Sequence, residues 1–152
     1  MNKRVVVIGY GNPLRTDDRF GLEVADRLKH AVGDSPHLAV HSTQQLLPEH
    51  IDWVKDTSWL LLIDASYEQP TGELCIRRVF RAPPHNTAAA HHLSADALVG
   101  LADAMGIKPP HVLLITAGGR SFEAGEAMTP ALVALADRTA DGILTRLTHH
   151  RT

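Results

Sequence analysis

The chain has 152 residues, of which 44% are hydrophobic and 21% are charged. This length and composition predict one globular domain over residues 1–147, followed by a polar tail at 148–152. The formal net charge of −2 gives no electrostatic basis for binding nucleic acid or an anionic membrane. One cysteine excludes an internal disulfide, and the sequence shows neither a signal-peptide core nor a transmembrane stretch of ~18 apolar residues, so a cytoplasmic protein is expected.

Hydrophobic periodicity predicts strands alternating with helices. Residues 5–8 are apolar and β-branched, as in a buried strand. Phe20, Val24 and Leu28 recur every four residues, as on the apolar face of a helix. The remaining elements expected, in chain order, are a strand at 38–41, a helix at 46–54, strands at 59–63 and 72–79, a helix from Ser94 to Met105, a strand at 111–116 and a helix from Thr129–Pro130 to about Leu147.

This order of elements predicts an α/β fold. We expect a single three-layer domain with a mainly parallel, twisted sheet of about five strands and helices on both faces. The strand at 72–79 is more polar than the others, so it should be an edge or antiparallel strand. Cys75, inside that strand, is expected to be buried and is not a credible nucleophile.

Three polar residues stand where such a sheet would bind a ligand. Asp64 ends the strand at 59–63, Asp18 follows the turn after the first strand, and His91 lies in the loop before a helix. In open α/β sheets, ligands bind outside the carboxyl ends of the strands. Two carboxylates and an imidazole meeting there would form an oxygen and nitrogen metal site with room for a substrate.

Each of these residues also has a structural interpretation. Of the two acids Asp17 and Asp18, we expect one to cap the following helix and the other to serve the site. Asp64 could equally well accept hydrogen bonds from loop amides. A histidine before a helix, such as His91, is more often structural than a ligand.

Other chemistries fit the sequence less well. Gly9-x-Gly11 after a strand invites a dinucleotide-binding interpretation, but Leu14 replaces the third glycine and Ser42–Thr43 stand where an acid should hold the ribose. The glycines then simply permit a tight strand-to-helix turn. The chain also lacks the His-Glu-x-x-His and Gly-x-Ser-x-Gly patterns, so a hydrolase of this sequence would need a metal to activate water or polarise a carbonyl.

Five segments carry the motifs that identify a family. They are Ile8-Gly9-Tyr10-Gly11-Asn12-Pro13-Leu14-Arg15-x-Asp17-Asp18-x-x-Gly21, Gln45-Leu46-x-Pro48-Glu49, Ile63-Asp64-Ala65, His91-His92-Leu93-Ser94 and Phe122-Glu123-x-Gly125-Glu126-x-Met128-Thr129-Pro130. Taken together, these segments resemble the hydrogenase maturation proteases, endopeptidases that trim the large subunit of nickel–iron hydrogenases, and the resemblance covers nearly the whole chain. The second and the last segment are similar to the branch of the family that serves soluble, cofactor-linked cytoplasmic hydrogenases.

The resemblance implies a site and a substrate. The family's catalytic, metal-contacting residues fall on Asp18, Asp64 and His91, with His92 as the other candidate histidine. The metal implied is nickel, supplied by the substrate and held there by cysteine thiolates, and no other cofactor is implied. The partner implied is the nickel-containing hydrogenase large subunit precursor, which loses a short C-terminal peptide. Arg19 departs from the small residue common after the acidic pair and would narrow the mouth of the site.

Two other functions stay open at this stage. A nucleotide-processing α/β enzyme would use the Gly9–Gly11 turn, and tight binding of a nucleoside phosphate would favour it. A non-enzymatic nickel carrier would bind nickel tightly and stoichiometrically in the absence of any substrate.

Overall fold

A computed structural model describes residues 4–33, 35–80, 93–125 and 127–149. Its five strands form one sheet in the order β2-β1-β3-β5-β4. The elements are β1 (Val5–Tyr10), η1 (Thr16–Arg19), α1 (Phe20–Val32), β2 (Leu38–Thr43), η2 (Pro48–His50), α2 (Ile51–Val54), β3 (Trp59–Ser66), β4 (Leu74–Val79), α3 (Ala95–Ala104), β5 (His111–Gly118) and α4 (Pro130–His149).

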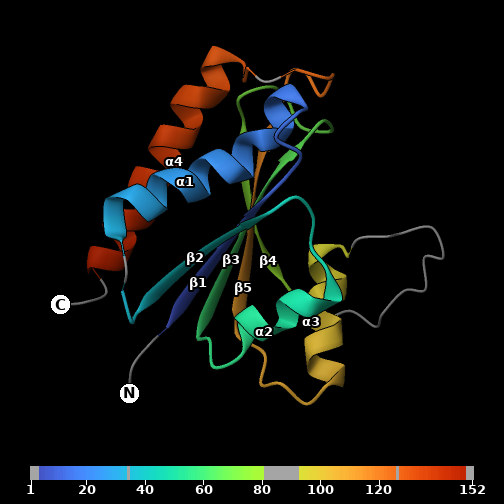
Figure 1. Cartoon of the computed structure of the whole chain (residues 1–152), viewed down its shortest axis with the longest axis vertical. Helices are drawn as coiled ribbons and strands as arrows, with labels where there is room; N and C mark the ends of the chain where they lie inside the picture. The colour runs from blue at the N-terminus through green and yellow to red at the C-terminus, as the bar shows by residue number, and fades with distance from the viewer. Residues whose placement is uncertain (1–3, 34, 81–92, 126, 150–152) are drawn as a thin grey trace.

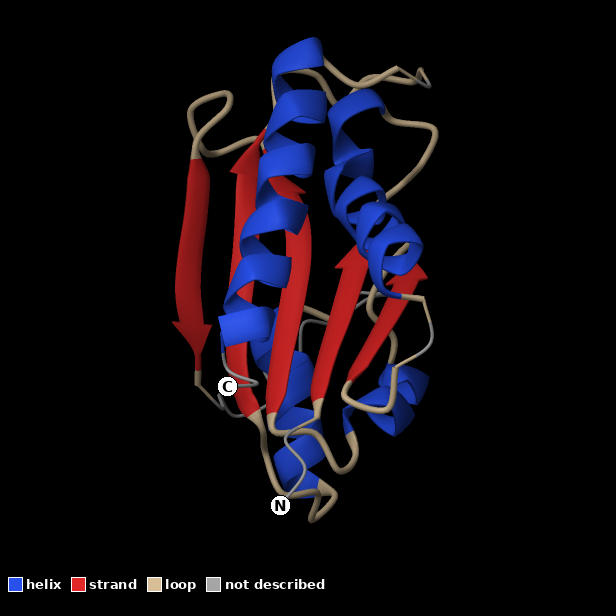
Figure 2. Cartoon of the chain, turned by 90° about the vertical axis from the view of Figure 1, so that its left-hand side faces the viewer, coloured by secondary structure: helices blue, strands red, loops and turns tan. Residues whose placement is uncertain are grey.

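The sheet is covered on both faces, because its central strands are apolar on both sides. Helices α1 and α4 lie next to each other on one face, and α2 and α3 lie on the other (Figures 1 and 2). Alternate residues of one strand serve opposite faces: Leu61 and Ile63 of β3 pack against the α1/α4 layer, and Leu60 and Leu62 pack against the α2/α3 layer. The predicted fold class, a three-layer α/β domain with a mainly parallel sheet, is confirmed.

The strand β4 has the predicted edge position and antiparallel direction. It pairs only with β5, in an antiparallel register, and it runs against the other four strands in Figure 2. The prediction that Cys75 is buried was wrong, because this residue is exposed. The first five residues of β4, Cys75 among them, are exposed, and Val79 at the end of the strand is buried. This pattern fits an edge strand, which has a neighbouring strand on one side of it.

Element boundaries differ from the prediction mainly in one place. The expected helix at 46–54 is reduced to the short turn η2 and a single turn of α2, because the chain enters from an extended Leu47 and Pro48 opens the turn. Ser94 caps α3 as predicted by accepting a hydrogen bond from the Ala97 N–H. Within the described ranges, no helix has the combination of length and apolar character that crossing a membrane requires.

Candidate functional site

The loops that follow β1, β3 and β5 gather at one end of the sheet, the upper end in Figure 1. These three strands are parallel neighbours, so their carboxyl ends meet there. The first loop leads into η1, which carries Asp17 and Asp18, and the second begins at Asp64 near the end of β3. Asp18 and Asp64 therefore lie at the carboxyl ends of neighbouring parallel strands.

Two glycines bring η1 and α1 onto the ends of β1 and β3. A Cβ on Gly21 would lie 2.1 Å from the carbonyl oxygen of Ile63, so any larger residue would push the start of α1 away from β3. Gly11 has a φ of +152°, and a Cβ there would lie 1.8 Å from the carbonyl oxygen of Asp18. The close approach that places Asp18 near Asp64 therefore depends on glycine.

Asp64 is a mostly buried carboxyl with little support from the protein. Its Oδ1 accepts one hydrogen bond, 2.8 Å long, from the N–H of Ala65. Burial raises the pKa of Asp64 to about 7, the Ala65 hydrogen bond opposes this, and the negative charge of Asp18 raises it further. A carboxylate held this way gains most from a cation, because a cation removes both the desolvation cost and the repulsion.

Asp18 serves the turn and the site together. Its Oδ2 accepts a 2.8 Å hydrogen bond from the N–H of Asn12, and Asn12 Oδ1 in turn accepts from the N–H of Leu14. These bonds fix the turn between β1 and η1. The Asp18 side chain is only partly buried, and its charge acts on Asp64.

Asp17 has a structural role different from the one expected. It does not cap its own helical turn, since η1 has no side-chain cap. It is fully buried and accepts four hydrogen bonds: from the N–H groups of Arg120, Ser121 and Thr129 at 2.7–3.1 Å, and from the Thr129 hydroxyl at 2.7 Å. Asp17 therefore ties the start of α1 to the β5–α4 loop and to the beginning of α4.

Of the three predicted site residues, the structure brings Asp18 and Asp64 together. His91, like His92, lies outside the described residues. The described chain resumes at Leu93, whose N–H donates a 3.0 Å hydrogen bond to the carbonyl oxygen of Leu46. Within the ranges described, no three side chains of His, Cys, Asp or Glu converge as a metal cluster.

Sequence reasoning missed two groups beside Asp64. The first is Tyr10, the last residue of β1, whose pKa is raised mainly by burial and then by the negative charge of Asp64. Thr116 is the register partner of Asp64 on β5, and its hydroxyl donates to the side-chain oxygen of Gln69. Gln69 also donates to the carbonyl oxygens of Thr116 (3.1 Å) and Glu73 (3.3 Å). The even spacing of Val6, Ile8 and Tyr10 would have placed the phenol on this face.

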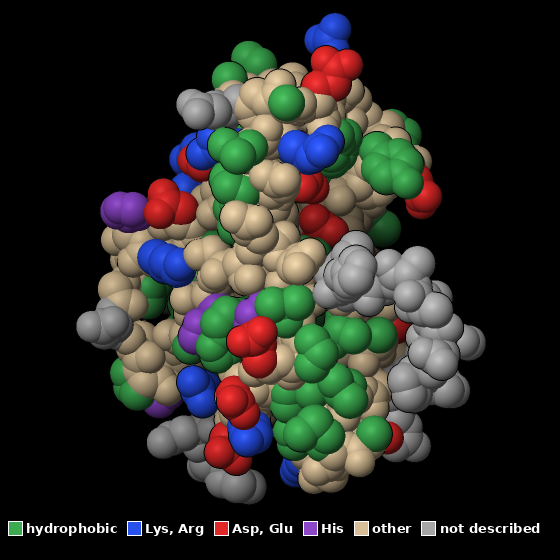
Figure 3. All heavy atoms as spheres, turned by 45° about the vertical axis from the view of Figure 1, so that its right-hand side comes forward, with side chains coloured by type: hydrophobic (Ala, Val, Ile, Leu, Met, Phe, Trp, Pro, Cys, Tyr) green, Lys and Arg blue, Asp and Glu red, His purple; other side chains and the backbone are tan. Residues whose placement is uncertain are grey.

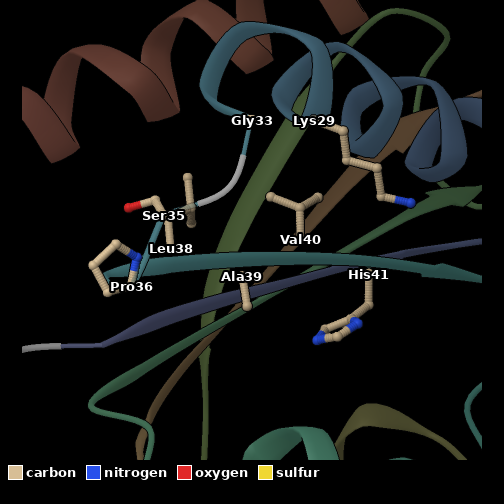
Figure 4. Close-up of a pocket in the computed structure, with 8 residues that line it drawn as sticks. All are labelled: Lys29, Gly33, Ser35, Pro36, Leu38, Ala39, Val40 and His41. Atoms are coloured by element: carbon tan, nitrogen blue, oxygen red, sulfur yellow. The ribbon is translucent and has the colours of Figure 1, made fainter.

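The surface beside the α2/α3 layer carries acidic side chains in a hollow near its centre (Figure 3). A different hollow, about 600 Å³ in volume, lies around the edge strand β2 at the opposite end of the sheet. In Figure 4, Lys29 and Val40 lie on the α1 side of β2, whereas Ala39 and His41 point to the other side. This second hollow wraps around the strand edge and takes no part in the site at Asp18 and Asp64.

The solved structures similar to this chain include hydrogenase maturation proteases. HybD, a hydrogenase maturating endopeptidase from E. coli, has a TM-score of 0.80 and 21% identity over 97% of this chain and 93% of its own. HycI, a [NiFe] hydrogenase maturation protease from Thermococcus kodakarensis KOD1, has a TM-score of 0.74 and 24% identity over 93% and 90%. A hydrogenase 2 maturation peptidase from a Thaumarchaeota archaeon has a TM-score of 0.68 and 23% identity over 96% and 99%.

No protein-family model matches the sequence. No curated protein matches it either. The similarity to solved structures nevertheless covers nearly the whole chain, so the chain has the fold of the hydrogenase maturation proteases, and the resemblance predicted from its motifs is confirmed at the level of the fold.

Proposed function

We propose that the protein is an endopeptidase that removes a short C-terminal peptide from the nickel-loaded large subunit precursor of a nickel–iron hydrogenase. The observation that carries the proposal is the pair Asp18 and Asp64 at the carboxyl ends of the strands, in a fold shared with maturation endopeptidases. The motifs at 45–49 and 122–130 favour a soluble, cofactor-linked hydrogenase as the partner.

Nickel enters this proposal as part of the substrate. Asp18, Asp64 and His91 are its proposed protein ligands, and the substrate's thiolates are the others. Carboxylate and imidazole donors suit nickel, and three protein ligands leave coordination positions for the substrate. The donor chemistry of the described residues fits this role, because two carboxylates of like charge lie near each other and no described cation is paired with either.

The ion at this position would polarise the scissile carbonyl or activate water. The sequence has no Gly-x-Ser-x-Gly turn that would present a serine nucleophile. We therefore assign the activation of water or of the carbonyl to the nickel ion that the substrate carries. A protease of this kind would be inert toward proteins that lack the nickel-bearing segment.

The test uses three purified precursors: one loaded with nickel, one free of nickel, and one loaded but lacking its C-terminal extension. Mass spectrometry of the products should show cleavage of the first only. Asp64→Asn should abolish this cleavage. Asp141→Asn is the matched control, because Asp141 is exposed on α4 far along the helix from the site. Shortening of the nickel-free precursor at a comparable rate would overturn the proposed role of nickel.

A further inference from the structure

Tyr10 and Asp64 occupy neighbouring positions on one face of the sheet. In the parallel register of β1 and β3, Gly9 pairs with Ile63, so the next residues along both strands are Tyr10 and Asp64. Val6 and Ile8 point into the α2/α3 layer, and Tyr10 packs against the same cluster. Leu60 and Leu62 place Asp64 on that face too. The phenol and the carboxyl therefore lie beside each other at the carboxyl end of the sheet.

The hydroxyl of Tyr10 has no protein partner in the described part of the chain. Asp64 likewise uses only Oδ1, toward the Ala65 N–H. Among the described residues, neither the Tyr10 hydroxyl nor Asp64 Oδ2 is a fully buried atom without a partner. Both atoms are therefore accessible to solvent or to a bound group.

The chemical state of Tyr10 suits it to donate. Burial first, and then the negative charges of Asp64 and Asp96, raise the pKa of Tyr10 above its ordinary value, against the opposing charge of Arg77. Arg77 of β4 and Asp96 of α3 form an ion pair at 3.1 Å, so their effects on the phenol partly cancel.

We propose that Tyr10 is a further catalytic residue of this site, whose hydroxyl donates a hydrogen bond to the carbonyl oxygen of the scissile peptide. The inference rests on the proposed endopeptidase function. In the hydrolysis, water adds to the carbonyl carbon and the C–N bond breaks. The hydroxyl of the water becomes part of the new carboxyl terminus, and its hydrogen goes to the released amine. Tyr10 keeps its proton and stabilises the negative charge that develops on the carbonyl oxygen.

The experiment compares wild type with Tyr10→Phe on the nickel-loaded precursor. Loss of one such donor should lower kcat by about 100-fold and leave KM within about twofold. Tyr67→Phe is the matched control, because Tyr67 is the only other tyrosine and is 78% exposed. An unchanged kcat, or a change confined to KM, in Tyr10→Phe would overturn the role of Tyr10 while leaving the endopeptidase function intact. A wild type that fails to cleave overturns both.

A second variant covers the case in which Tyr10→Phe melts more than about 5 °C below wild type. In the Tyr67→Phe protein, biosynthetic 3-fluorotyrosine enters at Tyr10 alone, since the chain has only two tyrosines. The substituted ring keeps its shape but is a stronger hydrogen-bond donor, so kcat should rise measurably at constant pH. A kcat equal to that of the unlabelled protein would count against the hydrogen bond and overturn the proposal.

Discussion

At Asp64, the requirements of a ligand site oppose those of stability. The carboxyl is mostly buried, accepts one hydrogen bond and lies near the negative charge of Asp18. Burial and this charge both raise its pKa. Its pKa of about 7 is well above the ordinary 3.8, so the folded protein holds this proton more tightly than the unfolded chain does. The folded state therefore loses stability as the pH rises from about 4 through about 7.

Asp64→Asn should consequently raise the stability of the protein above pH 7 while abolishing processing. The shift of about three pKa units corresponds to at most about 4 kcal/mol, and partial exposure of the carboxyl reduces this to about 1–2 kcal/mol. Urea unfolding at pH 5 and pH 8 measures the effect, which should be larger at pH 8. The alternative role, capping of the β3 loop, requires the opposite result: a variant that keeps activity and loses stability.

Asp17→Asn should do the reverse of Asp64→Asn and destabilise the fold. Burial alone would raise the pKa of Asp17, but the hydrogen bonds from Thr129, Ser121 and Arg120 lower it. An amide in its place turns its NH₂ group toward some of these donors, so a loss of about 2–4 kcal/mol is expected. Because the depressed pKa stabilises the fold at neutral pH, the difference from wild type should shrink as the pH falls below about 3.8.

Comparing Asp18→Asn with Asp17→Asn distinguishes the role of Asp18 in the site from the structural role of Asp17. Asp18 is partly exposed and accepts one hydrogen bond from the protein, so its amide variant should keep nearly the wild-type Tm but lose processing. Thermal melting and precursor cleavage on both variants give the answer. Equal losses of activity at positions 17 and 18, without a stability difference, would show that the two acids do not divide their roles in this way.

At the scale of elements, the segment that leads into η2 and α2 holds Leu93, the first residue of the described range 93–125. His50 is buried, and its Nδ1 accepts a 2.9 Å hydrogen bond from the N–H of Leu47. Its ring stacks on Trp53 at 4.3 Å, and His41 of β2 stacks on the same indole at 4.2 Å. The neighbouring carbonyl of Leu46 accepts from Leu93, two residues after His91.

Acid should loosen this segment before it unfolds the rest of the protein. Burial lowers the pKa of His50 below its ordinary 6.5, against the opposing charge of Glu49, so the unfolded chain takes up this proton first. The stability it contributes is complete above about 6.5 and declines as the pH falls through the lowered pKa. Protonation also removes the acceptor for the Leu47 N–H.

The measurement is amide hydrogen exchange at Leu93 between pH 7 and pH 5, corrected for the intrinsic rate. Protection of this amide should decrease as the pH falls, and His50→Ala should show the low protection already at pH 7. His30→Ala is the matched control, because His30 is exposed on α1 and its ring interacts with Asp26 of its own helix. Equal protection of the Leu93 amide in His50→Ala and wild type would show that His50 does not stabilise the hydrogen bond from Leu93.

At the scale of the whole molecule, the periodicity of the sequence was sufficient to predict the layers. The apolar run at 59–63 must be covered on both faces, because its side chains avoid water. The alternating polar residues at 72–79 must reach water on one side, which predicted an edge strand. The exposure of Cys75 and the role of Asp17 did not follow in the same way. The role of Asp17 depends on contacts such as the one with Thr129, 112 positions away, which local patterns do not encode.

The site was predictable to the extent that topology determines it. Parallel strands bring the residues after β1 and β3 to one edge, so Asp18 and Asp64 could be expected to meet. The alternation of Val6, Ile8 and Tyr10 gives the face of the sheet on which the phenol lies. Its position beside Asp64 becomes clear only from the register of β1 against β3.

The whole molecule should bind free nickel weakly, and more weakly in acid. Only three ligands are proposed to come from this chain, and one of them, Asp64, must first lose a proton that it holds up to about pH 7. Calorimetric titration with nickel at pH 6 and pH 8 should give a Kd above about 1 μM at both, with tighter binding at pH 8. In Asp64→Asn the dependence on pH should become weaker, because the proton that competes with nickel at Asp64 is gone. A sub-micromolar Kd would contradict the dependence on the substrate's ligands and would favour a nickel carrier instead, since a carrier must hold the ion without the precursor.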